Sequence, residues 1–130
     1  MASTGKTAVP TKTTESGLSK DDSESIKDGV KRYYLLVQRK DVDAAMDCYA
    51  SERRLYIKRP RLVAVAKDTD YYRIEEIDVI ALGPDRAKAV TSLKHKKYNQ
   101  PIESWEINLE FVREAGQWKI WSTPGKRVSP

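Results

Sequence analysis

The sequence predicts an α+β fold in which two to three N-terminal helices pack on a strongly curved antiparallel sheet of four or more strands. Apolar residues recur at helical spacing in the first half of the chain and alternate with polar residues in the second half. Compact turn signals separate the alternating runs, which is typical of a meander of hairpins. The 130 residues suffice for one such domain and are too few for two.

Residues 1–22 are predicted to form a disordered tail or linker, because they are rich in Ser and Thr and nearly lack large apolar side chains. The folded domain is expected to span residues 23–125, followed by a C-terminal tail at residues 126–130. Charges within residues 1–22 cancel, so the net charge of +5 belongs to the rest of the chain. A Thr-rich leader of this kind resembles a spacer and favours an extracytoplasmic bacterial domain.

Helices are predicted in the segment that follows. Asp22 or Ser23 can cap the first helix. Its apolar stripe consists of Ile26, Val30, Tyr33, Tyr34 and Val37. Asp41 can cap a second helix. The buried side of that helix consists of Val42, Ala45, Met46 and Tyr49. Pro60 suits the first turn of a short third helix over residues 61–67.

Four strand-like runs follow, at residues 71–82, 86–98, 103–113 and 117–123. The third run alternates most regularly. Its apolar face consists of Trp105, Ile107, Leu109 and Phe111. The alternation of the first run changes phase, which predicts a β-bulge near Glu75-Glu76. Three short helices cannot cover both faces of four long strands, so the other face should meet water or a partner.

Segments in both halves of the chain resemble parts of a known family. Residues 30–34, 39–45 and 49–50 are similar to two opening helices joined at a short Asp-containing loop. Residues 83–87 are similar to a hairpin before an Ala-led strand, and residues 111–120 to a closing hairpin. By these segments the chain resembles the nuclear transport factor 2-like superfamily, which includes ketosteroid isomerase, scytalone dehydratase, polyketide cyclases and many non-enzymatic modules. We predict a non-catalytic member with a cone-shaped, cystatin-like roll.

The resemblance implies a conical cavity between the helices and the sheet. It also implies a homodimer formed through the outer sheet face, where Trp121 would lie. The cavity is either a ligand pocket or a core filled by its own side chains. The residues expected to line it are Tyr33, Tyr34, Tyr49, Trp105, Ile107, Leu109, Phe111 and Trp118.

Isomerase-type members of the family use a tyrosine on the first helix as an oxyanion donor and an aspartate as general base. Tyr33 matches the tyrosine position. The general-base position falls near Ile57, which cannot carry a proton, and the closest carboxylate before it is Glu52. Tyr33 and His95 are the candidate catalytic residues, and they do not complete a catalytic set.

His95 is the only histidine of the chain. Strand alternation places it on the face opposite to Lys94 and Lys96. It could act as a general base paired with a carboxylate such as Asp78 or Glu106 on a neighbouring strand. We expect instead a partly exposed polar histidine among lysines.

A basic patch consists of Arg53, Arg54, Lys58, Arg59 and Arg61. We expect a solvated face there, although nucleic-acid binding with Tyr56 as a stacking platform is a weaker alternative. The single cysteine, Cys48, allows no intramolecular disulfide and is expected to be a buried thiol. One Cys and one His cannot supply a zinc site, so neither a metal nor a cofactor is predicted. No run approaches the roughly 20 apolar residues of a membrane span.

Together these observations predict a small non-catalytic domain that binds a small apolar molecule or a protein partner through an apolar conical cavity. The alternative is a small-molecule isomerase, dehydratase or cyclase that uses Tyr33, Tyr49 and His95 in the same cavity.

Overall fold

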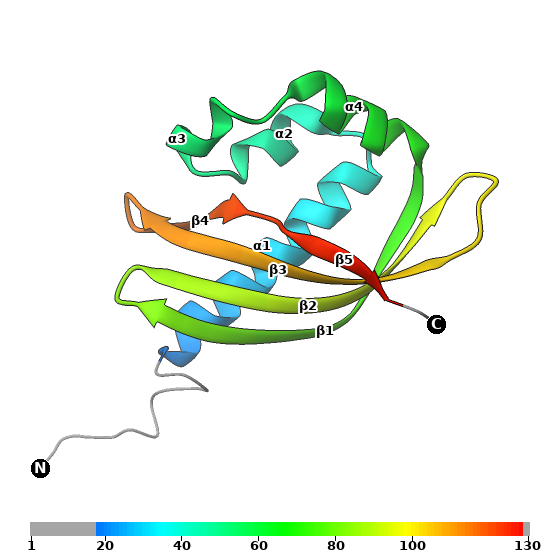
Figure 1. Ribbon diagram of the computed structural model, residues 1–130. Coiled ribbons are helices and arrows are strands. Elements are labelled where there is room, and N and C mark those ends of the chain that lie inside the picture. The colour runs from blue at the N-terminus through cyan, green and yellow to red at the C-terminus, as the bar shows by residue number, and fades with distance from the viewer. Residues whose placement is uncertain (1–17, 129–130) are drawn as a thin grey trace, which may run out of the picture.

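The computed structural model describes residues 18–128, and its helices precede its strands (Figure 1). The helices are α1 (Lys20–Gln38), α2 (Val42–Asp47), α3 (Ser51–Arg54) and α4 (Arg59–Asp68). The strands are β1 (Thr69–Gly83), β2 (Arg86–Lys97), β3 (Glu103–Glu114), β4 (Gln117–Ser122) and β5 (Gly125–Val128). All the strands pair antiparallel in one open sheet, which confirms the predicted α+β class.

Helix α1 begins at Lys20, three residues before the expected start of the folded domain at residue 23. Its cap is Ser19, whose Oγ accepts a hydrogen bond from the backbone N–H of Asp22 at 3.0 Å. Leu18 is only 5% exposed and belongs to the hydrophobic core. Residues 18–22 are therefore part of the domain, and the remainder of the predicted tail lies outside the described residues.

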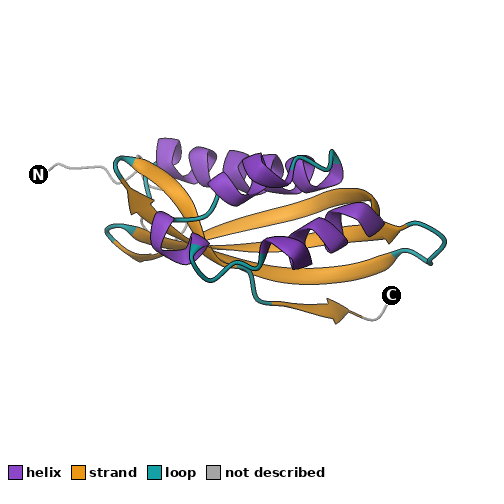
Figure 2. Ribbon diagram, turned by 90° about the horizontal axis from the view of Figure 1, so that it is seen from above, coloured by secondary structure: helices purple, strands orange, loops and turns teal. Residues whose placement is uncertain are grey.

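Two further helices follow α2 in the sequence and precede the first strand. The short helix α3 occupies a segment for which the sequence pattern made no clear prediction. Helix α4 begins at Arg59 and carries Pro60 in its first turn, as predicted, but it extends to Asp68. Figures 1 and 2 show α1 running along one face of the sheet, and in Figure 1 α2, α3 and α4 lie on the side of β4 and β5.

The sheet has the order β1-β2-β3-β4. The pairing of β1 with β2 shifts between Ile74 and Glu76, where the sequence predicted a bulge. Because of this shift, Tyr72, Ile74 and Ile77 all pack against the core despite their different phases in the sequence. The bulge thus keeps one face of a long, bent strand apolar.

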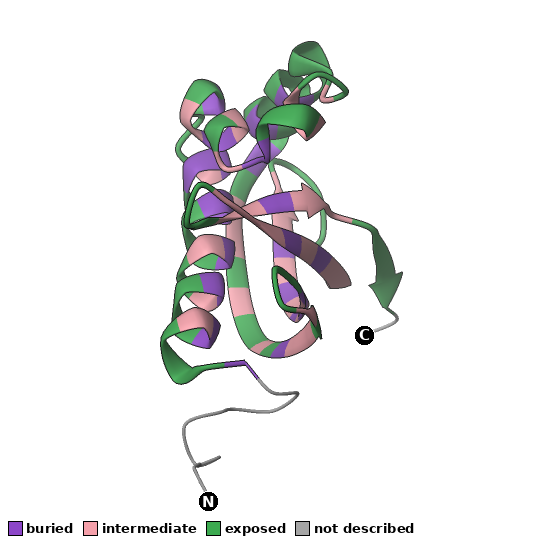
Figure 3. Ribbon diagram, turned by 90° about the vertical axis from the view of Figure 1, so that its left-hand side faces the viewer, coloured by how far each residue is buried: buried purple, intermediate pink, exposed green. Residues whose placement is uncertain are grey.

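Strand β5 continues the edge that β4 begins. Both strands pair with β3, β4 along Glu110–Glu114 and β5 along Ser104–Ile107. The backbone N–H of Asn108 donates to the Pro124 carbonyl at 2.8 Å between the two pairings. Residues 126–128 are therefore part of an exposed strand rather than the predicted C-terminal tail (Figure 3). Pro124 interrupts the edge and does not end it.

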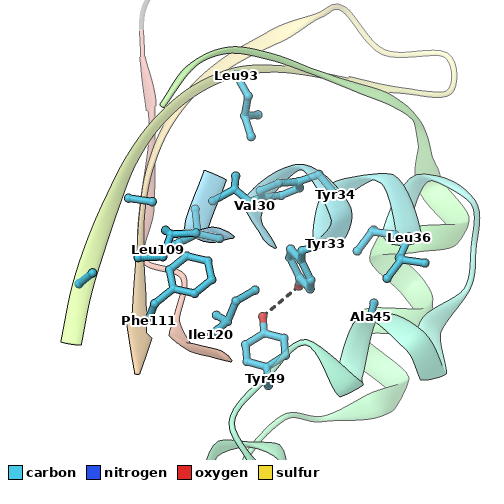
Figure 4. Packing of buried hydrophobic residues seen from close by; sticks show 14 of the residues in the cluster. Val30, Tyr33, Tyr34, Leu36, Ala45, Tyr49, Leu93, Leu109, Phe111 and Ile120 are labelled. Atoms are coloured by element: carbon cyan, nitrogen blue, oxygen red, sulfur yellow. Dashed lines mark hydrogen bonds between the residues drawn. The ribbon is translucent and has the colours of Figure 1, made fainter. Parts of the chain in front are cut away.

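The core lies between α1 and the concave face of the sheet (Figure 4). Leu109 and Phe111 are 0% and 1% exposed and share a cluster with Tyr33. Trp105 and Ile107 are half-buried and pack against the same cluster. The apolar face of β3 therefore meets the apolar stripe of α1, as the alternation of the third run predicted.

A polar clamp joins the start of α1 to the β3–β4 hairpin. The two guanidinium N–H groups of Arg113 donate to the two carboxylate oxygens of Asp22, each at 3.1 Å, and Trp118 Nε1 donates to Asp22 Oδ1 at 3.1 Å. The guanidinium of Arg113 also lies 4.3 Å from the centre of the Trp118 ring. These contacts lower the pKa of Asp22 from 3.8 to about 2, chiefly through the Arg113 hydrogen bonds.

Candidate functional site

A pocket of about 530 Å³ opens between α1, α4 and the concave face of the sheet. Its lining is mostly aromatic and aliphatic. The lining residues are Tyr33, Tyr34, Val37, Arg61, Leu62, Val65, Tyr72, Leu93, His95, Lys97, Trp105, Ile107, Thr123 and Gly125. Alternation along β2 brings Leu93, His95 and Lys97 to the pocket together.

His95 is only 7% exposed and lies at the centre of a small hydrogen-bonded network. Its Nε2 is 2.9 Å from Thr69 Oγ1, and that hydroxyl donates to the Val65 carbonyl at 2.8 Å. The imidazole also stacks on the Tyr72 ring, with 4.3 Å between ring centres and 10° between planes. Burial is the main cause that lowers the pKa of His95, and the Lys97 charge lowers it further. The neutral imidazole is therefore favoured at pH 7.

The expectation of a partly exposed histidine among lysines was therefore wrong. Lys94 and Lys96 do point to the other face, but the face that His95 shares with Leu93 is the inner one. Neither proposed carboxylate partner lies opposite His95, because Asp78 pairs with Val90 and Glu106 with Ser92. The residues opposite His95 are Tyr72 on β1 and Glu103 on β3.

Tyr33 and Tyr49 form a buried pair whose hydroxyl oxygens are 2.9 Å apart (Figure 4). Backbone hydrogen bonds of 2.8 Å from Ala50 to Ile120 and from Ile120 to Cys48 hold Tyr49 in place. Burial raises the pKa of Tyr33 well above its usual value, so this phenol stays neutral. One hydroxyl proton serves the bond within the pair, and the second can serve a further acceptor.

Ring contacts continue from this pair to His95. The ring centres of Tyr33 and Tyr34 are 5.1 Å apart, and those of Tyr34 and Tyr72 are 4.7 Å apart. The Gln38 side chain accepts a 2.9 Å hydrogen bond from the Tyr72 backbone N–H, which fixes β1 against the end of α1. The imidazole is thus linked through packed rings to the tyrosine pair.

Half of the predicted lining residues border the pocket, namely Tyr33, Tyr34, Trp105 and Ile107. The others do not. Tyr49 lies behind Tyr33, and Leu109 is sealed in the core. Phe111 and Trp118 border a second depression of about 250 Å³ between α1, α2 and β4. The cone is therefore filled at one end and hollow at the other.

Several lining residues were missed, above all Tyr72, Leu62 and Val65. Leu62 and Val65 are three residues apart on α4, a spacing that places them on one helix face. Tyr72 was assigned to a strand, but its position at the pocket depends on the bulge and on the approach of α1.

No carboxylate lines this pocket among the residues that the structure describes. Ile57, at the family's general-base position, packs against the core. Glu52 is exposed on α3. The geometry therefore joins the two catalytic candidates, Tyr33 and His95, in one pocket without a carboxylate base.

The residues of the predicted basic patch have different partners. Arg54 pairs with Asp47 and Arg59 with Asp43, each at 3.1 Å. The guanidinium of Arg53 lies 5.9 Å from the Tyr56 ring centre and 5.6 Å from that of Trp121. Lys58 is exposed, and Arg61 borders the pocket. Trp121 is thus covered in part by Arg53.

Within residues 18–128, no group of three or more His, Cys, Asp or Glu side chains could hold a metal ion. Cys48 is half-buried, and burial raises the pKa of its thiol. No helix in the same range is long and apolar enough to cross a membrane.

Solved structures with similar folds come from several bacteria. A provisionally named scytalone dehydratase from Novosphingobium aromaticivorans superposes with a TM-score of 0.69 at 11% identity, over 84% of this chain and 85% of that one. A provisionally named dehydratase of the NTF2-like family from Streptomyces avermitilis gives 0.64 at 14% identity, over 83% and 97%. An NTF2-like protein of unknown function from Silicibacter pomeroyi gives 0.54 at 14% identity, over 83% and 97%.

No family model matches the sequence, and no curated protein matches it either. At such identities the likeness to solved structures establishes the fold alone. The chain therefore has the fold of the nuclear transport factor 2-like (NTF2-like) superfamily, which its sequence predicted.

Proposed function

We propose that this chain is a small-molecule-binding domain and that its binding site is the pocket between α1, α4 and the sheet. The observation that carries the proposal is an open cavity of about 530 Å³, within the roughly 300–1,000 Å³ that ligand sites occupy. Aromatic and aliphatic side chains dominate its lining, and a few polar groups converge there. We propose a non-catalytic role because no described lining residue is a carboxylate base.

Tryptophan fluorescence and NMR together test this proposal. Trp105 borders the pocket, whereas Trp121 does not. A library of flat apolar fragments should contain members that change the fluorescence and shift the amide resonances of Tyr34, Tyr72 and Leu93. Trp105→Phe should remove most of the fluorescence response, and Trp121→Phe should keep it. Shifts confined to other surfaces, or none at all, would contradict binding in this pocket.

A second candidate function is an enzyme of the dehydratase kind. One observation favours it, namely that His95 and Tyr33 border the same pocket as a neutral imidazole and a neutral phenol. Two of the structures with similar folds are named as dehydratases. Incubation with scytalone, followed by product analysis, tests this candidate directly. Turnover that His95→Gln abolishes without weakening substrate binding would replace the non-catalytic proposal, and no turnover would leave it in place.

We also propose a homodimer through the outer sheet face. Val90 and Val112 lie on that face, because the neighbouring Ala89 and Phe111 are sealed in the core, and both valines are only half-buried. Sedimentation velocity over a concentration series should show a dimer that Val112→Glu weakens. A chain that stays monomeric at the highest concentration would exclude this interface.

A further inference from the structure

The charged side chains at the pocket all carry the same sign. Arg61 and Lys97 border the cavity, and no described lining residue is acidic. Neither cation forms an ion pair with another residue of the described range 18–128. Glu103 on β3 accepts hydrogen bonds from Trp105 at 3.1 Å and from Arg127 at 3.0 Å, and the nearby Lys97 charge also contributes to lowering its pKa. The pocket therefore favours an anion over a cation.

The cations nearest to Arg61 and Lys97 in sequence have partners of their own. Arg59, two residues before Arg61 on α4, donates to Asp43 at 3.1 Å. Lys96, beside Lys97 on β2, donates to a backbone carbonyl at 2.7 Å. Arg61 and Lys97 thus keep unpaired charges at the cavity, whereas Lys67 on α4 and Lys88 on β2, which also have no ion pair with another described residue, do not border it.

His95 contributes a hydrogen-bond acceptor of known orientation. The Thr69 hydroxyl has a single proton, and its bond to the Val65 carbonyl uses that proton. Thr69 Oγ1 must therefore accept from His95 Nε2, which fixes the neutral imidazole as the Nε2–H tautomer. Nδ1 is left with a free lone pair. Nδ1 has no partner among the described residues, and it is not one of the polar atoms sealed from solvent.

The remaining lining offers flat apolar surfaces. The indole N–H of Trp105 is already bonded to Glu103, so what this residue offers the pocket is its apolar ring. Tyr72 and His95 form a stacked pair on the neighbouring strands. A planar ring can pack against such surfaces at low conformational cost.

We infer that the ligand of this pocket is an aromatic carboxylate that also carries a hydroxyl group. The carboxylate binds near Arg61 and Lys97, the ring packs against Trp105, and the hydroxyl donates to His95 Nδ1. A carboxylate suits Arg61 because the guanidinium fork matches its two oxygens. This inference rests on the proposed binding function, and it names the class of ligand that the site selects.

Three related probes test the two polar contacts separately by calorimetry or Trp105 fluorescence. They are hydroxynaphthoate, its methyl ester, which lacks the anion, and methoxynaphthoate, which lacks the hydroxyl proton. Each change should weaken binding by about tenfold relative to hydroxynaphthoate. The advantage of the acid over the ester should shrink as salt is raised, because part of the pocket is open to solvent.

Matched variants assign each effect to its residue. Arg61→Gln should weaken binding of hydroxynaphthoate by about fivefold and leave binding of the ester nearly unchanged. Arg59→Gln, on the same helix, should change neither. His95→Phe keeps a ring against Tyr72 but removes the acceptor, so it should abolish discrimination between the hydroxy and methoxy probes and keep the preference for the acid.

Thr69→Val provides a readout that a purely structural role would not produce. The valine has nearly the same shape but cannot accept from Nε2, so His95 is no longer held in one tautomer. The imidazole ¹⁵N shifts should change from the pattern of a single Nε2–H tautomer to that of a mixture. Discrimination between the hydroxy and methoxy probes should fall in parallel, while the preference for the acid over the ester persists.

The outcomes separate the ligand class from the binding function. If the ester and the methoxy compound bind in the pocket as tightly as hydroxynaphthoate, the pocket binds ligands but the inferred class is wrong. If Arg59→Gln weakens binding as much as Arg61→Gln, the carboxylate contact is wrong. If none of the probes binds and no fragment of the library shifts the pocket resonances, the proposed function fails and the inference fails with it.

Discussion

The clamp between Asp22, Arg113 and Trp118 makes a sharp prediction about stability. Asp22→Asn preserves the shape of the side chain but removes the charge that accepts three hydrogen bonds of 3.1 Å. Asp21 is the matched control, because it lies in the same first turn of α1 and has no hydrogen bond or ion pair with another described residue beyond the helix backbone. Both variants remove one negative charge near the positive end of the helix dipole. Their difference therefore isolates the clamp.

The pKa of Asp22 gives the magnitude. Its fall from 3.8 to about 2 is equivalent to about 2.4 kcal/mol of stabilisation when the carboxylate is fully charged. The side chains of Asp22 and Arg113 are 27% and 30% exposed, so solvent screens part of this energy. We expect Asp22→Asn to lower the free energy of unfolding by about 1–1.5 kcal/mol at pH 7, and Asp21→Asn by less than about 0.5 kcal/mol.

The pH dependence checks the cause. Because the pKa is lower in the folded state, the carboxylate stabilises the fold above pH 3.8, and this contribution is lost as pH falls toward 2. Urea unfolding at pH 7 and pH 3 should show the penalty of Asp22→Asn reduced by about half at the lower pH. Equal penalties for the two variants at pH 7, or a penalty that does not change between the two pH values, would refute the clamp as a source of stability.

Three further predictions concern the pocket and its edge. Tyr33→Phe and Tyr49→Phe should each cost about 1 kcal/mol, and the double variant should cost less than their sum; strict additivity in a double-mutant cycle would show that the hydroxyl pair contributes nothing. A Cβ on Gly125 would come within 2.9 Å of a β3 side chain, so Gly125→Ala should speed hydrogen exchange in β5, whereas Gly83→Ala, which has open space, should not; equal exchange would contradict the close approach. Because the pKa of His95 is lowered in the folded state, the unfolded chain binds a proton at higher pH than the folded chain, and stability should fall as pH drops below 6.5. His95→Phe should flatten this dependence of stability on pH. An unchanged slope in urea titrations would exclude His95 as its origin.

The fold could be predicted from the sequence because its strongest signals are periodic. The alternation of β3 and the helical stripe of α1 each define one apolar face. Both faces are buried only when they pack against each other. Even the phase change near Glu75 was informative, since one extra residue in β1 keeps the same face inward. Such patterns depend on neighbours in sequence, which is why they can be seen without a structure.

The boundaries were harder, because local signals compete there. Ser19 and Ser23 are both good caps, and the sequence does not say which one is used. Pro124-Gly125 is a strong stop signal for a strand, but the Pro124 carbonyl accepts from β3 and the edge resumes as β5. A proline tolerates this position because the edge strand needs only some of its donors.

The site could be predicted only in part, because its geometry depends on contacts distant in sequence. His95 lies between lysines, so its surroundings in sequence are polar, whereas its partners in space are Thr69 and Tyr72, more than twenty residues away. Arg61 was grouped with other arginines by sequence, although it alone among them borders the pocket. The face of the helix or strand that a residue occupies, rather than its type, decides whether its charge borders the cavity.

The pairing of β2 with β3 explains why one end of the cone is core and the other is pocket. At the filled end Ala87 and Ala89 lie opposite Phe111 and Leu109, so a small residue on one strand leaves room for a large one on the next. At the other end His95 on β2 lies opposite Tyr72 on β1. A polar ring there replaces the tight apolar contact, and space remains. Tight packing and open space are thus divided along a single pair of strands, and substitutions at the pocket end should cost less stability than truncations of Phe111 and should alter the proposed binding.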